Sequence, residues 1–274
     1  MLKDVLAVVQ GSERGRTAAQ FALGFAQLHQ AHLGLTIATE RLMWTAMLDP
    51  MGAYLAEPER EREHMGQMEA FRALADASPV DCDIRGIFEE VTFIPGQADL
   101  QSRCADLVLI GPESSWSDRR LRRHVIDAVL IDAAAPVLLF PPDLPPRKAA
   151  HAVLGWNESA EASRAARALH QLVEPGGSID VVIVEPLRTP DGRAAEPGRA
   201  IVEHYARHGF EAELHVCPAG GRPVAEVLES FATMRKAQLL AVGAYAHSRV
   251  RELLLGGATR DLIDHQRLPV LMVH

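Results

Sequence analysis

The stretch that decides the fold is AQLLAVG, Ala237–Gly243, because an altered copy of it, ADLVLIG, occupies Ala105–Gly111. The final glycines of the two copies are 243 − 111 = 132 positions apart. Each copy is followed by a short apolar segment that begins at a proline, Pro136 or Pro269, and these are 269 − 136 = 133 positions apart. Two landmarks with nearly the same offset indicate that the chain repeats one structural plan.

The openings of the two repeats also match. The segments DVLAVVQGSE, from Asp4, and HAVLGWNESAE, from His151, each predict an apolar strand, a polar turn and a helix. In the second repeat Ser159 is the expected N-cap, and Pro175–Gly177 is expected to end the helix. Ser178–Val184 is nearly all apolar, as in a parallel strand buried on both faces. The apolar residues that share one face of this helix are Ala162, Ala165, Ala166, Leu169, Leu172 and Val173.

This alternation predicts an α/β protein made of two tandem doubly wound, Rossmann-like domains. Each is expected to hold a mainly parallel five-stranded sheet with helices on both faces. The segment PPDLPPRK, Pro141–Lys148, has four prolines in eight residues and predicts a stiff linker. The expected domains are therefore residues 1–145 and 146–274. Arg41–Glu69 has no counterpart of equal length in the second repeat and predicts an excursion with a long charged helix.

Composition excludes several classes of protein. The 274 residues carry a formal net charge of −8, which argues against non-specific binding of nucleic acid. No apolar run is long enough to span a bilayer. Three scattered cysteines predict free buried thiols in a reducing compartment, and therefore a cytoplasmic protein. One basic cluster is interpreted as a solvated helix face: Arg119, Arg120, Arg122, Arg123 and His124.

Ligands of doubly wound sheets bind beyond the carboxyl ends of the strands. Gly243 ends a predicted strand there, and Gly256 and Gly257 precede the last predicted helix. The N–H groups at a helix start attract an anion, and Thr259 adds a hydroxyl group. The alternative is purely structural: Gly243 permits a tight turn, and the glycine pair permits close packing of helix and sheet. Glycine spacing leaves both interpretations open.

The strand-one openings, LLAVGAYAHSRVRELLLGGATRDLI and the closing LPVLMVH together resemble a tandem universal stress protein. The resemblance covers both repeats and implies an adenine nucleotide alpha hydrolase-like fold. Nucleotide-binding members carry a glycine, two residues, a second glycine, nine residues, then glycine and Ser or Thr. Gly243 and Gly256 match that spacing, but the second glycine is replaced by Ala246 and the Ser or Thr by Gly257.

The resemblance also implies how a nucleotide, ATP or ADP with Mg²⁺, would lie in the second domain. The base would rest near Asn157, at the family's acidic position, and near Val184. The phosphates would lie between Gly243 and the N–H groups of Gly256, Gly257 and Ala258, with Thr259 donating its hydroxyl. The first domain has no glycine between Gly111 and its closing strand and has Gln10 at the acidic position. Its ligand motif is therefore degenerate, and a structural role is expected.

Two function classes remain open: a stress-response regulatory protein that binds an adenine nucleotide, and a ligand-free module for dimerisation or partner docking. No catalytic residue is assigned, because the chain has neither a P-loop nor a GxSxG motif. Slow ATP hydrolysis is a weaker third alternative. His204 and His208 are spaced like paired metal ligands, but no third ligand is apparent, so no metal site is predicted.

Assembly follows from the edge strands. Val137–Phe140 and Val270–Val273 are apolar segments of one chain, and pairing them would remove two exposed edges. Single-domain relatives pair through their last strands, as the resemblance implies. We therefore expect an intramolecular pseudo-twofold dimer, and further dimerisation of the whole chain is left open.

Overall fold

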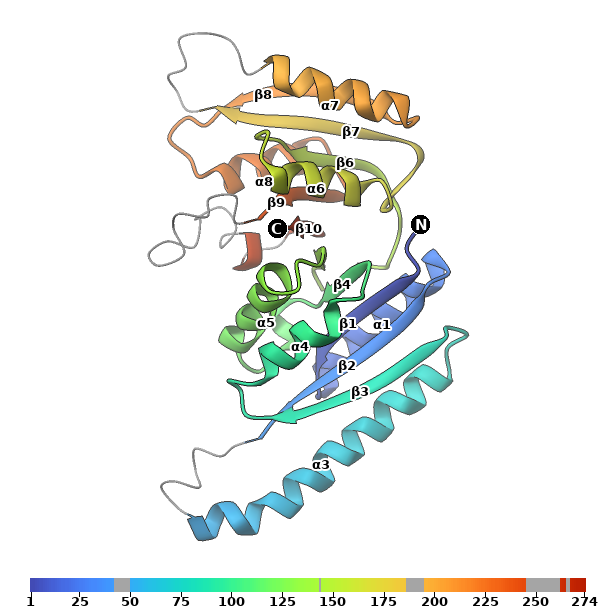
Figure 1. Ribbon diagram of the computed structural model, residues 1–274, viewed down its shortest axis with the longest axis vertical. Helices are drawn as coiled ribbons and strands as arrows, with labels where there is room; N and C mark the ends of the chain where they lie inside the picture. The colour runs from blue at the N-terminus through green and yellow to red at the C-terminus, as the bar shows by residue number, and fades with distance from the viewer. Residues whose placement is uncertain (42–49, 143, 186–194, 245–261, 265–266) are drawn as a thin grey trace. The chain divides into compact units, whose positions relative to one another are not determined.

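The structure, a computed structural model, describes residues 1–41, 50–142, 144–185, 195–244, 262–264 and 267–274. The chain divides into two compact units (Figure 1). The first, Met1–Val137 with Pro142–Pro146, is called the N-terminal half, and the second, Leu138–Pro141 with Arg147–His274, the C-terminal half. Among the described residues, no helix combines the length and the apolar character needed to cross a membrane.

The N-terminal half alternates strands and helices around a sheet of order β3-β2-β1-β4-β5. The β1–β2, β1–β4 and β2–β3 pairs are parallel. The long charged helix expected in the excursion is present as α3. The elements are β1 (Asp4–Gln10), α1 (Glu13–His29), β2 (His32–Glu40), α3 (Pro50–Asp76), β3 (Cys82–Glu89), α4 (Ile94–Ser102), β4 (Leu107–Ile110), the 3₁₀ helix η1 (Glu113–Ser115), α5 (Arg119–Ile131) and β5 (Val137–Leu139).

The C-terminal half repeats this topology, with the strand order β8-β7-β6-β9-β10 and parallel pairing in β6–β7, β6–β9, β7–β8 and β9–β10. The prediction of two tandem Rossmann-like sheets of five strands is therefore confirmed. The elements are β6 (Ala149–Gly155), α6 (Ala160–Leu169), β7 (Val173–Glu185), α7 (Ala195–Arg207), β8 (Glu211–Pro218), α8 (Val224–Met234), β9 (Leu239–Gly243) and β10 (Val270–Val273).

Helices cover both faces of the C-terminal sheet. The helices α6 and α7 share one face, where the buried Tyr205 hydroxyl of α7 donates to the Ala166 carbonyl of α6 at 3.1 Å. The helix α8 packs on the other face, where a Cβ at Gly155 would lie 2.9 Å from Leu228. Successive residues of a strand point to opposite faces, so β7 needs apolar residues on both, as its sequence predicts.

The end of α6 differs from the prediction. The helix stops at Leu169, and Val173, expected on its apolar face, begins β7. Ala149 pairs with Val173 and His151 with Ser178, so β7 advances 178 − 173 = 5 residues where β6 advances 151 − 149 = 2. Pro175–Gly177 therefore forms a bulge within the strand and does not terminate the helix, and Gly176 takes a φ of 77° in it.

Two interpretations of single side chains are wrong. Arg122, assigned to a solvated helix face, is 2% exposed, and its Nε donates to the Gly111 carbonyl at 2.8 Å. Its guanidinium caps the end of β4, a role that helical periodicity does not reveal. Cys104, expected to be buried, is exposed, whereas Cys82 and Cys217 are half-buried. All three are free thiols, and burial, followed by Asp83, Asp81 and Asp76, raises the pKa of Cys82 to about 11.

Candidate functional site

The carboxyl edge of the C-terminal sheet brings three of the predicted site residues onto neighbouring strands. In the register of the sheet Gly155 of β6 pairs with Val182 of β7 and with Val242 of β9. Asn157 lies two residues beyond Gly155, and Val184 lies two beyond Val182. Gly243 follows Val242 as the last residue of β9. The three positions therefore share one edge, as the topology of the repeat predicts.

Asn157 belongs to the turn that starts α6. Its Oδ1 accepts hydrogen bonds from the backbone N–H of Ser159 at 3.2 Å and from the Ser159 hydroxyl at 2.7 Å. Ser159 is the N-cap, as predicted, and its Oγ accepts from the N–H of Ala162 at 3.1 Å. Because this oxygen orders the turn, the Asn157 amide NH₂ is the part of the side chain that remains to donate to a ligand.

Gly243 lies under the first turn of α6. A Cβ at Gly243 would stand 2.5 Å from the backbone nitrogen of Ala162 and 2.8 Å from the carbonyl carbon of Glu161. Only glycine lets the strand end approach the helix backbone this closely. The geometry supplies the structural interpretation of this glycine, and the phosphate-binding interpretation stays a prediction. Val184 is half-buried near the end of β7, which lies on the other side of β6 from β9.

The remaining predicted site residues lie outside the described residues. These are Ala246, Gly256, Gly257, Ala258 and Thr259. The proposed phosphate half of the site is therefore a prediction from sequence alone, whereas the positions proposed for the base are placed in the structure.

The corresponding edge of the N-terminal half holds a cavity of about 480 Å³, although its ligand motif was expected to be degenerate. Gln10, at the position matching Asn157, is buried and donates to the Ser117 hydroxyl at 2.5 Å and to Glu40 at 3.4 Å. Its carbonyl oxygen accepts from the Ser117 N–H. Both ends of this amide thus join protein partners, which fits the structural role expected for this half. The cavity lining includes Gln10, Ser12, Arg14, Glu40, Arg60 and Gln67.

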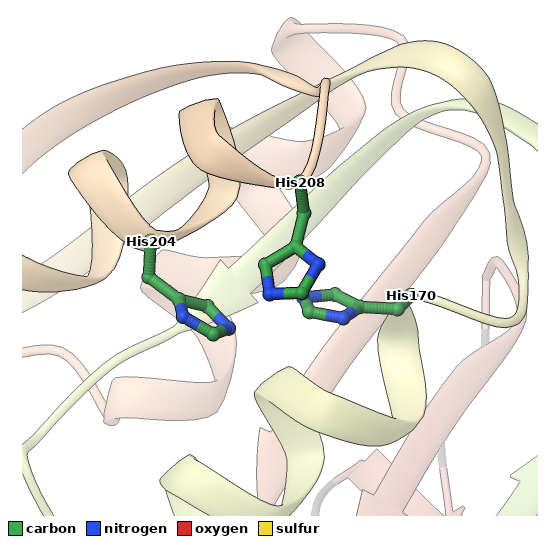
Figure 2. A group of neighbouring side chains, drawn as sticks. All are labelled: His170, His204 and His208. Carbon is green, nitrogen blue, oxygen red and sulfur yellow. The ribbon is translucent and has the colours of Figure 1, made fainter.

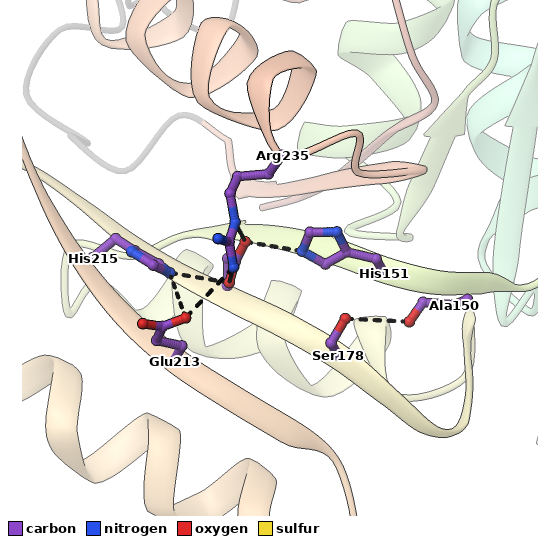
Figure 3. A network of polar contacts seen from close by, with 7 residues as sticks. Ala150, His151, Ser178, Glu213, His215 and Arg235 are labelled. Atoms are coloured by element: carbon purple, nitrogen blue, oxygen red, sulfur yellow. Dashed lines mark hydrogen bonds and ion pairs between the residues drawn. The ribbon is translucent and has the colours of Figure 1, made fainter.

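A polar network under α8 was not predicted from the sequence. Asp180 of β7 is 2% exposed and accepts two hydrogen bonds from Arg235, at 2.8 and 3.1 Å. Its two oxygens also contact His151 Nε2 at 2.9 Å and His215 Nε2 at 3.0 Å. Figure 3 shows Arg235, His151 and His215 converging from three different elements. Since these partners occupy both carboxylate oxygens, the network is built for stability and leaves Asp180 little capacity to hold a metal.

Known structures share this fold along nearly the entire chain. A universal stress protein from Archaeoglobus fulgidus DSM 4304 has a TM-score of 0.71 at 16% identity, covering 98% of this chain and 95% of its own. A candidate universal stress protein from Pseudomonas aeruginosa UCBPP-PA14 has a TM-score of 0.59 at 17% identity, covering 99% of this chain and 93% of its own. A protein of unknown function from Pseudomonas aeruginosa PAO1 has a TM-score of 0.59 at 16% identity, covering 99% and 92%.

A scan against protein-family models and a search of curated proteins find no match to the sequence. At 16–17% identity the structural likeness establishes the fold. The chain is thus an α/β protein with the architecture of tandem universal stress proteins, as the sequence resemblance implied. What it binds has to be argued from its own residues.

Proposed function

We propose that this chain is a cytoplasmic regulatory protein of the universal stress type whose C-terminal half binds an adenine nucleotide. The ligand is ATP or ADP with Mg²⁺, held at the carboxyl edge of the β6, β7 and β9 strands. The observation that carries the proposal is the register that aligns Asn157, Val184 and Gly243 at that edge. An amide donor beside an apolar side chain suits the polar edge and flat face of an adenine base.

The second candidate function is a ligand-free interaction module, and two observations favour it. The Asn157 carbonyl oxygen already caps the turn before α6, and Gly243 already has a packing role against that helix. Both residues would be retained in a protein that binds no nucleotide. The two functions therefore differ in whether the Asn157 NH₂ group donates to a bound nucleotide in solution.

Replacing Asn157 with Leu should weaken ATP binding at least about tenfold, because the base loses a hydrogen-bond donor and faces an apolar group instead. Asn157→Asp is the matched variant, because it keeps the oxygen that accepts from Ser159 and removes only the NH₂ donor. It should also bind ATP more weakly than the unmodified chain, because a carboxylate has no donor to offer the base. Isothermal titration with ATP at fixed salt and Mg²⁺ measures the three affinities.

Two further variants test the phosphate half of the proposal, which rests on the glycine spacing. Ala246→Gly should strengthen binding by restoring close backbone approach, and Gly256→Val should abolish it by filling the phosphate position. Equal ATP affinity for the unmodified chain, Asn157→Leu and Gly256→Val would refute the nucleotide site. If no variant binds and Ala246→Gly does not rescue, the interaction module is the better account.

A further inference from the structure

Three histidines gather at the end of the C-terminal half where the helices α6 and α7 end (Figure 2). His170 directly follows α6, His204 lies in the last turn of α7, and His208 directly follows α7. Each helix ends near the amino end of the next strand, β7 or β8. The cluster therefore lies away from the carboxyl edge proposed for the nucleotide, and its role is independent of that proposal.

The rings lie close enough to share one ion. Ring centroids are 4.5 Å apart for His204 and His208, 4.7 Å for His170 and His208, and 5.3 Å for His170 and His204. One ring nitrogen from each residue lies within 4.8 Å of the other two. Ligands on tetrahedral Zn²⁺ at about 2.0–2.1 Å stand about 3.3–3.4 Å apart. The three nitrogens therefore have to approach one another by at most about 1.5 Å to share such an ion.

The backbone that carries the cluster is fixed by packing. His204 and His208 are four residues apart at the end of a helix, which places them on one face. The N–H of His208 donates to the Tyr205 carbonyl at 3.0 Å, and the buried Tyr205 hydroxyl holds α7 against α6 through Ala166. His170 is thus presented to the histidine pair by the same contact that joins the two helices.

A buried ring nitrogen of His170 points to a bound group. The Nε2 atom of His170 is buried and has no hydrogen-bond partner among the described residues, which is destabilising unless another group occupies it. Burial, followed by His208 and His204, lowers the pKa of His170 to about 4. Burial, followed by His208, Arg207 and Arg167, also lowers the pKa of His204. The buried Nε2 atom of His170 and the spacing of the three rings are therefore what point to a shared ion.

We propose that His170, His204 and His208 form a binding site for a late first-row transition-metal dication such as Zn²⁺. Three imidazoles suit Zn²⁺, Ni²⁺ or Cu²⁺, whereas Mg²⁺ and Ca²⁺ require oxygen ligands that this group does not supply. A water molecule completes the tetrahedron. The ion joins the ends of α6 and α7 and so stabilises the folded C-terminal half. The guanidinium groups of Arg167 and Arg207 oppose a dication, which makes the site weaker than an all-thiolate one.

The test is Zn²⁺ affinity of the full chain after removal of metals, measured at pH 7.5 by competition with a chromophoric chelator. His170→Phe keeps an aromatic ring against Tyr205 and Phe210 but removes one ligand. We expect the Zn²⁺ affinity to fall at least about 100-fold. Mutating a residue that only supports a ligand lowers metal affinity roughly 10–100-fold, so a loss above that range identifies His170 as a ligand. His124→Gln, at an exposed helical histidine of the N-terminal half, should leave affinity unchanged.

Two further readouts separate a metal site from aromatic packing. Co²⁺ bound to the unmodified chain should give the intense visible absorption of a four-coordinate ion, and His208→Gln, at the most exposed of the three, should abolish it. Zn²⁺ should raise the melting temperature of the unmodified chain but not of His208→Gln. If His170→Phe fails to fold, the Zn²⁺ affinity of His208→Gln tests the proposal instead. Equal Zn²⁺ affinity in the unmodified chain and His208→Gln, or no binding by either, would overturn the proposal.

Discussion

Replacing Asp180 with Ala should lower the free energy of unfolding of the C-terminal half by about 3 kcal/mol at pH 7. The carboxylate is 2% exposed and is the common acceptor for Arg235, His151 and His215. Its removal leaves three donors on one face of the sheet without their shared acceptor. The Arg235 side chain is 40% exposed, so it can regain water, which keeps the expected loss at the lower end of the range for a broken buried ion pair.

The contribution of Asp180 depends on pH with a definite sign. Burial alone would raise the pKa of this carboxyl group, but hydrogen bonds from Arg235, His151 and His215 together lower it. A group whose pKa is lower in the folded state binds its proton more readily in the unfolded chain. Its stabilisation is therefore fully present above the unfolded value of 3.8 and is lost as the pH falls through the folded pKa.

Urea unfolding of the unmodified chain and Asp180→Ala measures the effect, with the transition of the C-terminal half analysed separately, since two units need not unfold together. Glu203→Gln is a suitable control, because Glu203 pairs with Arg207 at 3.9 Å and both side chains are well exposed. It should change stability by no more than about 0.5 kcal/mol. The same urea midpoint for Asp180→Ala and Glu203→Gln would show that the network contributes nothing specific.

The sheet could be predicted because its determinants are local and repeated. Parallel strands buried on both faces are nearly continuous apolar segments, as in Leu107–Ile110 and Val270–Val273. The helix start at Ser159 follows from a hydroxyl that must satisfy the N–H of Ala162. Because the second repeat reproduces the strand order of the first, one correct unit determines the other.

The errors occur where a contact distant in sequence overrides a local pattern. Val173 fits the apolar periodicity of a helix, but pairing with Ala149 draws it into β7. Arg122 belongs to a charged run, yet the carbonyl at Gly111 provides a buried acceptor for it. In both cases the deciding partner lies elsewhere in the chain, and a window of neighbouring residues does not contain it.

The candidate sites also divide into positions that local patterns predict and contacts between distant segments that they do not. Asn157 and Val184 could be placed at one edge because each lies at or just beyond the carboxyl end of a strand whose order was predicted. His170 is 204 − 170 = 34 residues from His204, and only the packing of α6 against α7 brings it beside the histidine pair. The sequence offers one positional signal: His170 and His208 each directly follow a helix and stand three residues before the next strand begins.

Replacing Gly243 with Ala should destabilise the C-terminal half by about 2–3 kcal/mol, the cost of forcing a methyl group into a filled space. The new Cβ would lie 2.5 Å from the Ala162 nitrogen and 2.8 Å from two atoms of Glu161. Two of these three contacts are with backbone atoms of α6, so the helix itself must move. That movement would also disturb the turn at Asn157, which the Ser159 cap joins to the same helix.

Gly66→Ala is the matched control, because a Cβ at Gly66 of α3 would have nothing within 4 Å. There the same change should raise stability by about 0.5–1 kcal/mol, since alanine loses less backbone freedom on entering a helix. Urea unfolding of both variants, together with ATP titration, distinguishes the two interpretations of Gly243. A large loss of stability in Gly243→Ala supports the packing role that the geometry indicates. Unchanged stability with loss of ATP binding would show instead that this glycine serves the phosphates, and that α6 can yield to a methyl group.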